Sequence, residues 1–215
     1  MELMAHTRMS DDWIERAVRD NPIVLLDNGN YRTCPVRLSF PNILNMSRPK
    51  KANIAPSYGA NLLFPTCADL KPLEAAVVAV LKEKCPDALS PDPRKKVKVK
   101  LPFLDQEDML KYDGYTEGGR YIIATSKTNK PIVVDIKEQL ITDESRIYPG
   151  VWAICTVRPF WYDVDVNKGV SFGLQSVMVV ADDDSLGGGG ENIAEAFANV
   201  KIDAGDVDAD QLFGN

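Results

Sequence analysis

Two long alternating segments near the C-terminal end constrain the fold more than any other feature. They are GVWAICTVRPFWY (150–162) and GVSFGLQSVMVV (169–180), and only DVDVNK separates them. In the first segment one parity holds Val151, Ala153, Cys155, Val157, Pro159 and Trp161, all apolar or small. Alternating runs joined by so short a connection predict a β-hairpin with one face toward a core. The chain is therefore expected to be mostly β.

The remaining chain predicts further short strands and one inserted helix. Strands are expected at 31–40, 58–64, 94–103, 120–127 and 131–136; in the first, Val36, Leu38 and Phe40 share the apolar parity. LKPLEAAVVAVLKEK (70–84) predicts a core helix, because Leu73, Ala76, Val77, Val80 and Leu81 recur at helical spacing. Ser10 could cap a short helix over Asp11–Arg19. This pattern favours an OB-type Greek-key barrel over a sandwich.

Charge divides the chain into three parts. Residues 182–215 hold nine acids and one lysine, a net of −8, whereas residues 31–181 hold 16 acids and 21 bases, a net of +5. The first 30 residues precede the strand pattern. We therefore expect an N-terminal extension (1–30), an OB-type domain (31–181) and a glycine-rich linker with a disordered acidic tail (182–215). A basic body with an acidic tail suggests a polyanionic partner for the body.

The second parity of the 150–162 segment carries the most informative candidates. It interleaves Trp152, Phe160 and Tyr162 with Arg158. Such a face can stack bases on its rings while the guanidinium neutralises a phosphate, as in proteins that hold single-stranded nucleic acid. The alternative is that these rings cover a barrel end or form a homodimer contact.

Basic residues elsewhere add candidate phosphate contacts. Lys96, Lys98 and Lys100 alternate with Val97, Val99 and Leu101, and Arg48, Lys50 and Lys51 lie in a proline-containing loop. Tyr121 and Lys127 share one parity of RYIIATSK (120–127). Alternating lysines can also simply protect a strand edge or form a solvated face.

Catalytic chemistry finds little support in the sequence. The stretch SLGGGGENIAEAF lacks the Lys-Ser/Thr of a phosphate loop and is flanked by acids. A metal-dependent nuclease could use Asp105, Glu107 and Asp108, or Asp163 and Asp165, but aspartate is also common in turns. No metal site or cofactor is expected. The four scattered cysteines are expected to be reduced. No stretch is apolar for long enough to span a membrane.

The chain resembles the OB-fold single-stranded DNA-binding proteins of phages, many known only as a phage domain of unknown function. The resemblance lies in VRLSFPNI, YGANLLFP, GRYIIATSKTNKPIVVD, IYPGVWAICTVRPFWYDVDVNKGVSFGLQSVMVV and SLGGG, in this order from Val36 to Gly190. It implies a non-catalytic protein that coats single-stranded DNA during phage replication or recombination, in the cytoplasm of the infected host.

The same resemblance gives a role to the tail. It implies that an acidic C-terminal tail contacts replication or recombination proteins and competes with DNA for the basic groove. Here Asp206, Asp208 and Asp210 would supply the charge and Phe213 the anchor, although Gly214 and Asn215 follow Phe213. Two alternatives remain: a disordered tail that only confers solubility, and a phage structural or assembly protein whose aromatic face forms oligomers.

Overall fold

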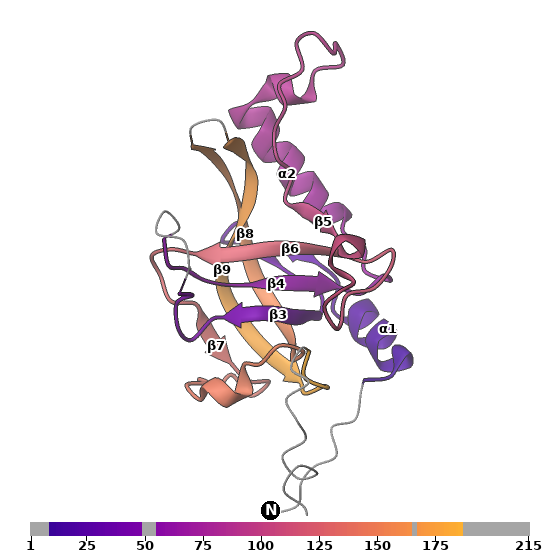
Figure 1. The fold of residues 1–215 in the computed structure, drawn as a ribbon, viewed down its shortest axis with the longest axis vertical. Helices are drawn as coiled ribbons and strands as arrows, with labels where there is room; N and C mark the ends of the chain where they lie inside the picture. Colours follow the sequence, from indigo (N-terminus) through magenta and orange to yellow (C-terminus); the bar gives the residue numbers. More distant parts are fainter. Residues whose placement is uncertain (1–8, 49–54, 165–166, 187–215) are drawn as a thin grey trace, which may run out of the picture.

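The computed structural model describes residues 9–48, 55–164 and 167–186. Its elements are α1 (Asp11–Asp20), β1 (Val24–Leu25), β2 (Tyr31–Arg32), β3 (Val36–Asn42), β4 (Tyr58–Phe64), α2 (Lys71–Lys84), β5 (Phe103–Asp105), β6 (Arg120–Ser126), β7 (Ile132–Val134), β8 (Trp152–Val164) and β9 (Asn167–Ala181). Short 3-10 turns lie at Pro86–Leu89, Gln106–Met109 and Glu144–Arg146. The fold is thus mostly β with two α-helices, and the predicted hairpin is confirmed as β8 and β9 (Figure 1).

Five strands pair in a ring. β3 pairs with β4, β4 with β6, β6 with β9, β9 with β8, and β8 again with β3. All of these pairings are antiparallel except that of β6 with β9, which is parallel. β1 and β2 extend β8, while β7 adds to β9.

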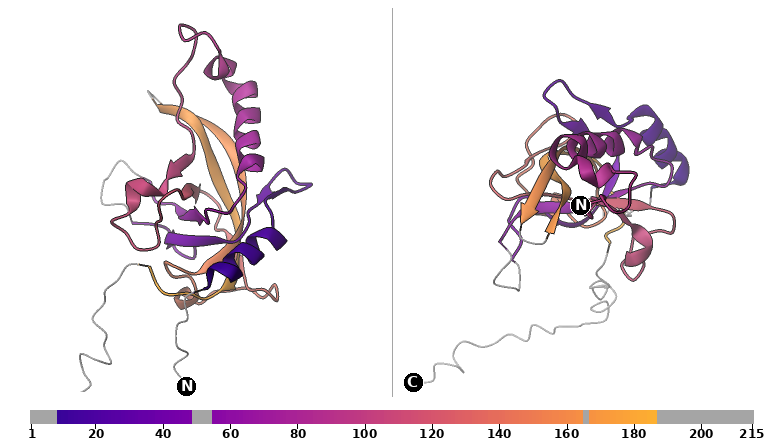
Figure 2. Two further views of the ribbon diagram at one scale, coloured as in Figure 1. Left: turned by 90° about the vertical axis from the view of Figure 1, so that its right-hand side faces the viewer. Right: turned by 90° about the horizontal axis from the view of Figure 1, so that it is seen from above.

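The core lies inside this ring, as the predicted parity of the hairpin requires. Val151, Ala153, Cys155 and Val157 are all fully buried, and so are Leu38, Leu62, Ile122 and Phe172 from the other strands. α2 contributes Leu73, Val77 and Leu81 to the same core and lies along the hairpin (Figure 2). The helical spacing predicted for residues 70–84 is therefore confirmed.

The described part of the N-terminal extension packs against the body. Ser10 caps α1, its Oγ accepting a hydrogen bond from the Trp13 amide at 3.3 Å. Val18 and Ile23 join the main core, and the Trp13 ring contacts the edge of Trp152 with 5.6 Å between centroids. Neither described helix is long and apolar enough to cross a membrane.

Two predicted strands differ from the structure. Of the strand expected at 94–103, only Phe103 lies in a ladder, as the first residue of β5 against β6, and Lys100 forms an isolated bridge with Gly169. In β3 the register shifts between Ser39 and Asn42, and Phe40 adopts a left-handed φ of 48°. This bulge turns Phe40 outward, 46% exposed, and buries Ser39, so the predicted core position of Phe40 is wrong.

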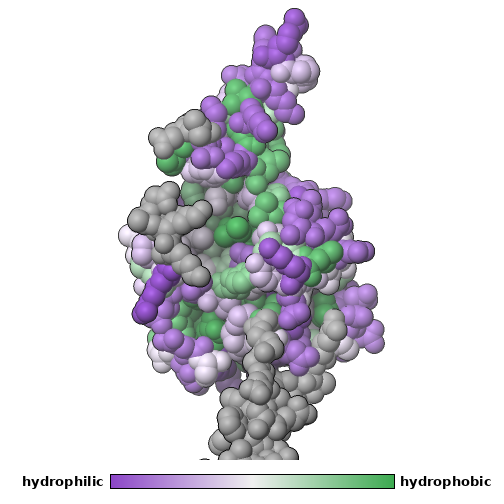
Figure 3. All heavy atoms as spheres, viewed as in Figure 1, coloured by the Kyte–Doolittle hydropathy of each residue, from purple (hydrophilic) through white to green (hydrophobic). Residues whose placement is uncertain are grey.

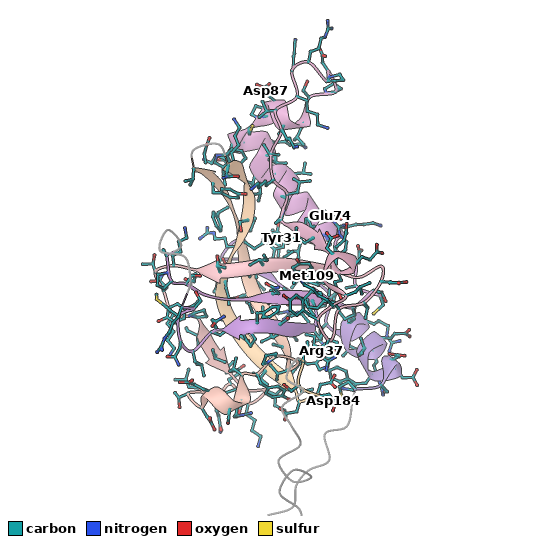
Figure 4. All side chains as sticks on the ribbon, viewed as in Figure 1. Tyr31, Arg37, Glu74, Asp87, Met109 and Asp184 are labelled. Atoms are coloured by element: carbon teal, nitrogen blue, oxygen red, sulfur yellow. The ribbon has the colours of Figure 1, made fainter. Side chains whose placement is uncertain are left out.

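The fold also continues past residue 181, where the linker was expected to begin. Asp183 is 2% exposed and forms an ion pair with Arg37 at 3.2 Å. Arg37 Nη2 also donates to the Asp184 carbonyl at 2.7 Å. Figure 4 labels both residues. Leu186 is buried in a second apolar cluster with Leu63, Tyr115 and Tyr121. We call residues 182–186 the strap.

Candidate nucleic-acid interface

The outward parity of the β8–β9 hairpin forms a face of rings and small residues. Arg158 pairs across the strands with Gly173, and Phe160 pairs with Ser171. Directly opposed residues of an antiparallel pair lie on the same face of the sheet. Arg158 is exposed and Phe160 is 42% exposed. Because Ser171 and Gly173 are small, the ring and the guanidinium are not covered from the opposite strand.

Tyr162 continues this surface toward the hairpin tip. It is half-buried and pairs with Gly169. At Gly169 the Lys100 backbone crosses close to β9: the Lys100 amide donates to the Lys168 carbonyl at 2.9 Å, and its carbonyl accepts from the Val170 amide at 3.1 Å. A Cβ at Gly169 would collide with the Lys100 carbonyl, so glycine permits this crossing.

The crossing brings the predicted lysines to the hairpin. Lys96, Lys98 and Lys100 are exposed, whereas Val97 and Val99 are half-buried. The predicted alternation therefore holds over residues 96–100 although the segment is not a strand, and it is wrong at Leu101, which is 55% exposed. We call residues 95–102 the lysine segment. The backbone of this segment bonds to β9 at Lys100. Its exposed ammonium groups are suitable for contacts to a phosphate backbone.

The surface extends from the hairpin onto β6 and β4. Thr125 of β6 pairs with Gly173, and Ile123, two residues earlier, is 43% exposed. We call the surface formed by Ile123, Thr125, Arg158, Phe160, Ser171 and Gly173 the outer face. Lys127 follows β6 and Arg48 precedes β4; both are exposed. The pairing of Tyr58 with Ser126 places them at one end of the β4–β6 pair.

Trp152, predicted to stack a base, and Tyr121, predicted as a further DNA contact, are both buried, so both predictions are wrong. Trp152 is 4% exposed: its indole Nε1 donates to Asp183 Oδ2 at 2.7 Å, and its ring contacts Trp13. Tyr121 is 6% exposed in the second apolar cluster. Burial raises the pKa of the Tyr121 phenol, with Tyr115 adding to the shift. Both residues have the outward parity, but the strap and the 104–115 connection cover their end of the sheet.

Three exposed residues were not predicted. Arg32 pairs with Thr156 and so lies on the same side of the sheet as Arg158. Phe40 and Tyr112 contact edge to face with 5.2 Å between centroids, and Tyr112 is 40% exposed. Arg32 could have been identified as a candidate phosphate contact, because it is a charged residue within the strand expected at 31–40. The bulge that exposes Phe40 has no signal in the alternation pattern.

Other candidates fall elsewhere. Lys50 and Lys51 lie outside the described residues, as do Asp165 and the tail residues Asp206, Asp208, Asp210 and Phe213. Over the ranges that the structure covers, no group of three or more His, Cys, Asp or Glu side chains could hold a metal ion. Two cavities, of about 380 and 430 Å³, lie beside α1; Trp152 at the start of β8 lines the first, and no residue of the outer face lines either.

Comparisons with known proteins agree with the sequence resemblance. Residues 30–211 match the family described as Enterobacter phage Enc34, ssDNA-binding protein. No curated protein sequence matches the chain.

Solved structures show the same likeness. The single-stranded DNA-binding protein from bacteriophage Enc34 in complex with ssDNA has a TM-score of 0.65 and 20% identity over 87% of this chain and 100% of that one. A C-terminal truncation of that protein gives 0.60 and 18% over 86% and 98%. A single-stranded DNA-binding protein encoded by bacteriophage T7 gives 0.53 and 16% over 73% and 93%. At these identities the likeness is one of fold.

Proposed function

The chain belongs to the family of ssDNA-binding proteins described from Enterobacter phage Enc34, and from this premise we propose that it binds and coats single-stranded DNA without catalysis. We further propose that the ring of five strands is an OB-type barrel. The order of its pairings, with a single parallel contact between β6 and β9, supports that assignment.

One observation carries the functional proposal: an exposed ring, Phe160, and an exposed cation, Arg158, share the outer face. Phe160 can stack a base, because it is exposed and its cross-strand neighbour is Ser171. Arg158 stands on the same face and reaches over the β1–β2 turn, where a Cβ at Gly29 would lie 3.7 Å from its Nη2. Stacking on aromatic rings combined with cations for the backbone is how single strands are held in a groove.

The proposed path of the strand follows the exposed cations. It runs from the lysine segment over Arg158 and Phe160, and crosses Thr125 toward Lys127 and Arg48. Lys50 and Lys51 would extend the basic end. Trp152 and Tyr121 are left out of this path because they are buried.

A second part of the proposal concerns the biological process and the acidic tail. We propose that the protein acts in phage DNA replication or recombination, in the cytoplasm of the infected host. In this proposal the tail contacts replication proteins through Phe213 and competes with DNA through its aspartates. The charges support it: a net of −8 over residues 182–215 against +5 over residues 31–181. A polyanionic segment attached to a basic body can occupy the same sites as a phosphate backbone.

Single substitutions on the outer face test the proposal. Fluorescence anisotropy with labelled oligo-dT would be measured over a salt series for F160A and K98A. Because base stacking contributes about 1–3 kcal/mol, F160A should weaken binding by roughly 5- to 150-fold with little change in salt slope. K98A should lower the slope by about 0.7.

Matched controls lie away from the outer face. Ile136, 67% exposed on the turn after β7, is the control for Phe160, and Lys137, exposed on the same turn, is the control for Lys98. I136A and K137A should leave both affinity and slope unchanged. If F160A and K98A bind oligo-dT like the unmodified chain, the strand does not follow this path. The aromatic face should then be tested as an oligomer contact by sedimentation.

A further inference from the structure

A small hollow lies on the β3–β4–β6 side of the sheet, and the function proposed above does not assign it. Its volume is about 130 Å³, and Phe40, Asn42, Asn61, Gly59, Ile123 and Thr125 are among its lining residues. None of the lining residues is charged. We call it the amide hollow. Figure 3, viewed toward β3, β4 and β6, shows apolar surface (green) within a largely hydrophilic surround on this side.

Two asparagines give the amide hollow hydrogen-bonding capacity. Asn61 Nδ2 donates to the Tyr115 hydroxyl at 2.9 Å, and that hydroxyl donates to Ser39 Oγ at 3.2 Å. Tyr115 and Ser39 are buried, so this chain fixes the Asn61 amide. Asn61 Oδ1 accepts no hydrogen bond from the described residues and is available to a ligand. Asn42 Nδ2 donates to the Phe40 carbonyl at 3.1 Å, which orients the second amide.

Phe40 supplies an exposed ring to the amide hollow. The bulge between Ser39 and Asn42 turns it out of the core, and its left-handed φ of 48° is uncommon for a residue other than glycine. Tyr112 supports the ring from outside the hollow by the edge-to-face contact. An aromatic side chain held outward in this way presents a flat apolar surface next to the amides of Asn42 and Asn61.

The amide hollow is continuous with the outer face. Thr125 lines the hollow and pairs with Gly173, which in turn lies opposite Arg158. A strand following the proposed path therefore passes beside the hollow. The exposed cations Arg48 and Lys127, at one end of the β4–β6 pair, can hold phosphates next to an extruded nucleotide.

We propose that the amide hollow holds one unstacked base of the bound strand, with Asn42 and Asn61 hydrogen-bonding its edge. The proposal rests on the proposed function. A neutral, planar ring with donors and acceptors on its edge matches an uncharged hollow lined by an aromatic ring and two amides. Bases splayed from a single strand are recognised in this way, by stacking and by hydrogen bonds to their edges. The protein should consequently prefer some bases at this one position.

The test compares homopolymers and a photo-crosslink. Affinities for dT, dC and dA oligonucleotides of equal length would be measured for the unmodified chain and for an N42A/N61A variant. Losing hydrogen bonds to the base should weaken binding of the preferred homopolymer by about fivefold or more. The ratio between the most and least preferred homopolymers should move toward one. A strand with 5-iododeoxyuridine should crosslink to peptides that contain Phe40 or Tyr112.

A matched control and the crosslink separate the possible failures. Gln139, an exposed amide on the turn after β7, is the control, and Q139A should not change the ratio. If N42A/N61A keeps the unmodified ratio and crosslinks form only at Phe160 or Tyr162, the strand binds but the amide hollow holds no base. If neither the unmodified chain nor its variants bind any homopolymer, the proposed function fails and this inference fails with it.

Discussion

At the scale of single residues, the cysteines show how far the interior is isolated from water. Cys34 and Cys155 are buried in the core, whereas Cys67 is exposed. Burial raises the pKa of the Cys34 thiol to about 12, and it also raises the pKa of Cys155. Because the thiolate is the reactive form, a raised pKa and a buried position both slow the reaction of these two thiols.

The expected result is a strongly biphasic thiol titration. At pH 8 Cys67 should react first with a disulfide reagent, and C67S should lose that fast phase. A pKa of about 12 leaves only about one Cys34 thiol in ten thousand ionised at this pH. Cys34 and Cys155 should therefore react only after unfolding in guanidinium. Equal rates for all four cysteines in the folded chain would contradict the buried positions.

The same shift links stability to pH. The unfolded chain loses the Cys34 proton near pH 9, while the folded chain keeps it up to about pH 12. The folded chain binds more protons over this interval, so the free energy of unfolding should fall as pH rises through it. Below pH 9 both the folded and the unfolded chain keep the Cys34 proton, so the free energy of unfolding carries its full contribution from this thiol there.

Single residues also show where sequence analysis succeeds and where it fails. Parity predicted the core side of 151–157 and the exposure of Arg158 and Phe160, because a regular strand alternates strictly. It failed for Phe40, where a bulge changes the parity, and for Trp152 and Tyr121, which distant segments cover. Neither bulges nor covering segments are encoded in local alternation.

At the scale of elements, the strap is the least expected part of the fold. Its sequence, DDDSL, is typical of a linker. It is nevertheless held by hydrogen bonds at the carbonyls of Asp184 and Pro149 and by the ion pair of the buried Asp183 carboxylate. Arg37 bonds to the Asp183 side chain and the Asp184 carbonyl, and the Leu186 amide donates to the Pro149 carbonyl at 2.7 Å. Gly150, at a left-handed φ of 112°, allows the strap to approach closely. Such long-range partners cannot be identified from the sequence.

Substitution of Asp183 should destabilise the fold. D183A removes the carboxylate that pairs with the largely buried Arg37 guanidinium and accepts from the Trp152 indole N–H, while Arg37 keeps its hydrogen bonds to two backbone carbonyls, so a loss of about 1–3 kcal/mol is expected. D184A is the matched control, because Asp184 contributes only its carbonyl to Arg37 and its side chain is exposed; its effect should stay within about 0.5 kcal/mol. Urea unfolding followed by tryptophan fluorescence gives both values. Equal stabilities for the two variants would mean that the buried ion pair does not stabilise the strap.

At the scale of the whole molecule, the charge of the chain changes sign close to the strap. Residues 31–181 have a net charge of +5 and residues 182–215 a net charge of −8, and within the strap Leu186 is buried beside Tyr115 and Tyr121. The sequence predicted this asymmetry because it depends on composition alone. The tertiary contacts of residues 182–186 do not follow from composition, so a truncation that tests the tail must keep the chain up to Leu186 rather than end at Ala181.

The central proposal is that the ring of five strands binds single-stranded DNA and that the acidic tail opposes this binding. The most direct test is anisotropy with labelled oligo-dT and a matching duplex over a salt series, for the full chain and for a chain that ends at Leu186. We expect a preference for the single strand, weaker binding as salt increases, and tighter binding by the shortened chain. If neither chain binds the single strand at low salt, the proposed function is contradicted; if both bind it equally, the tail does not compete.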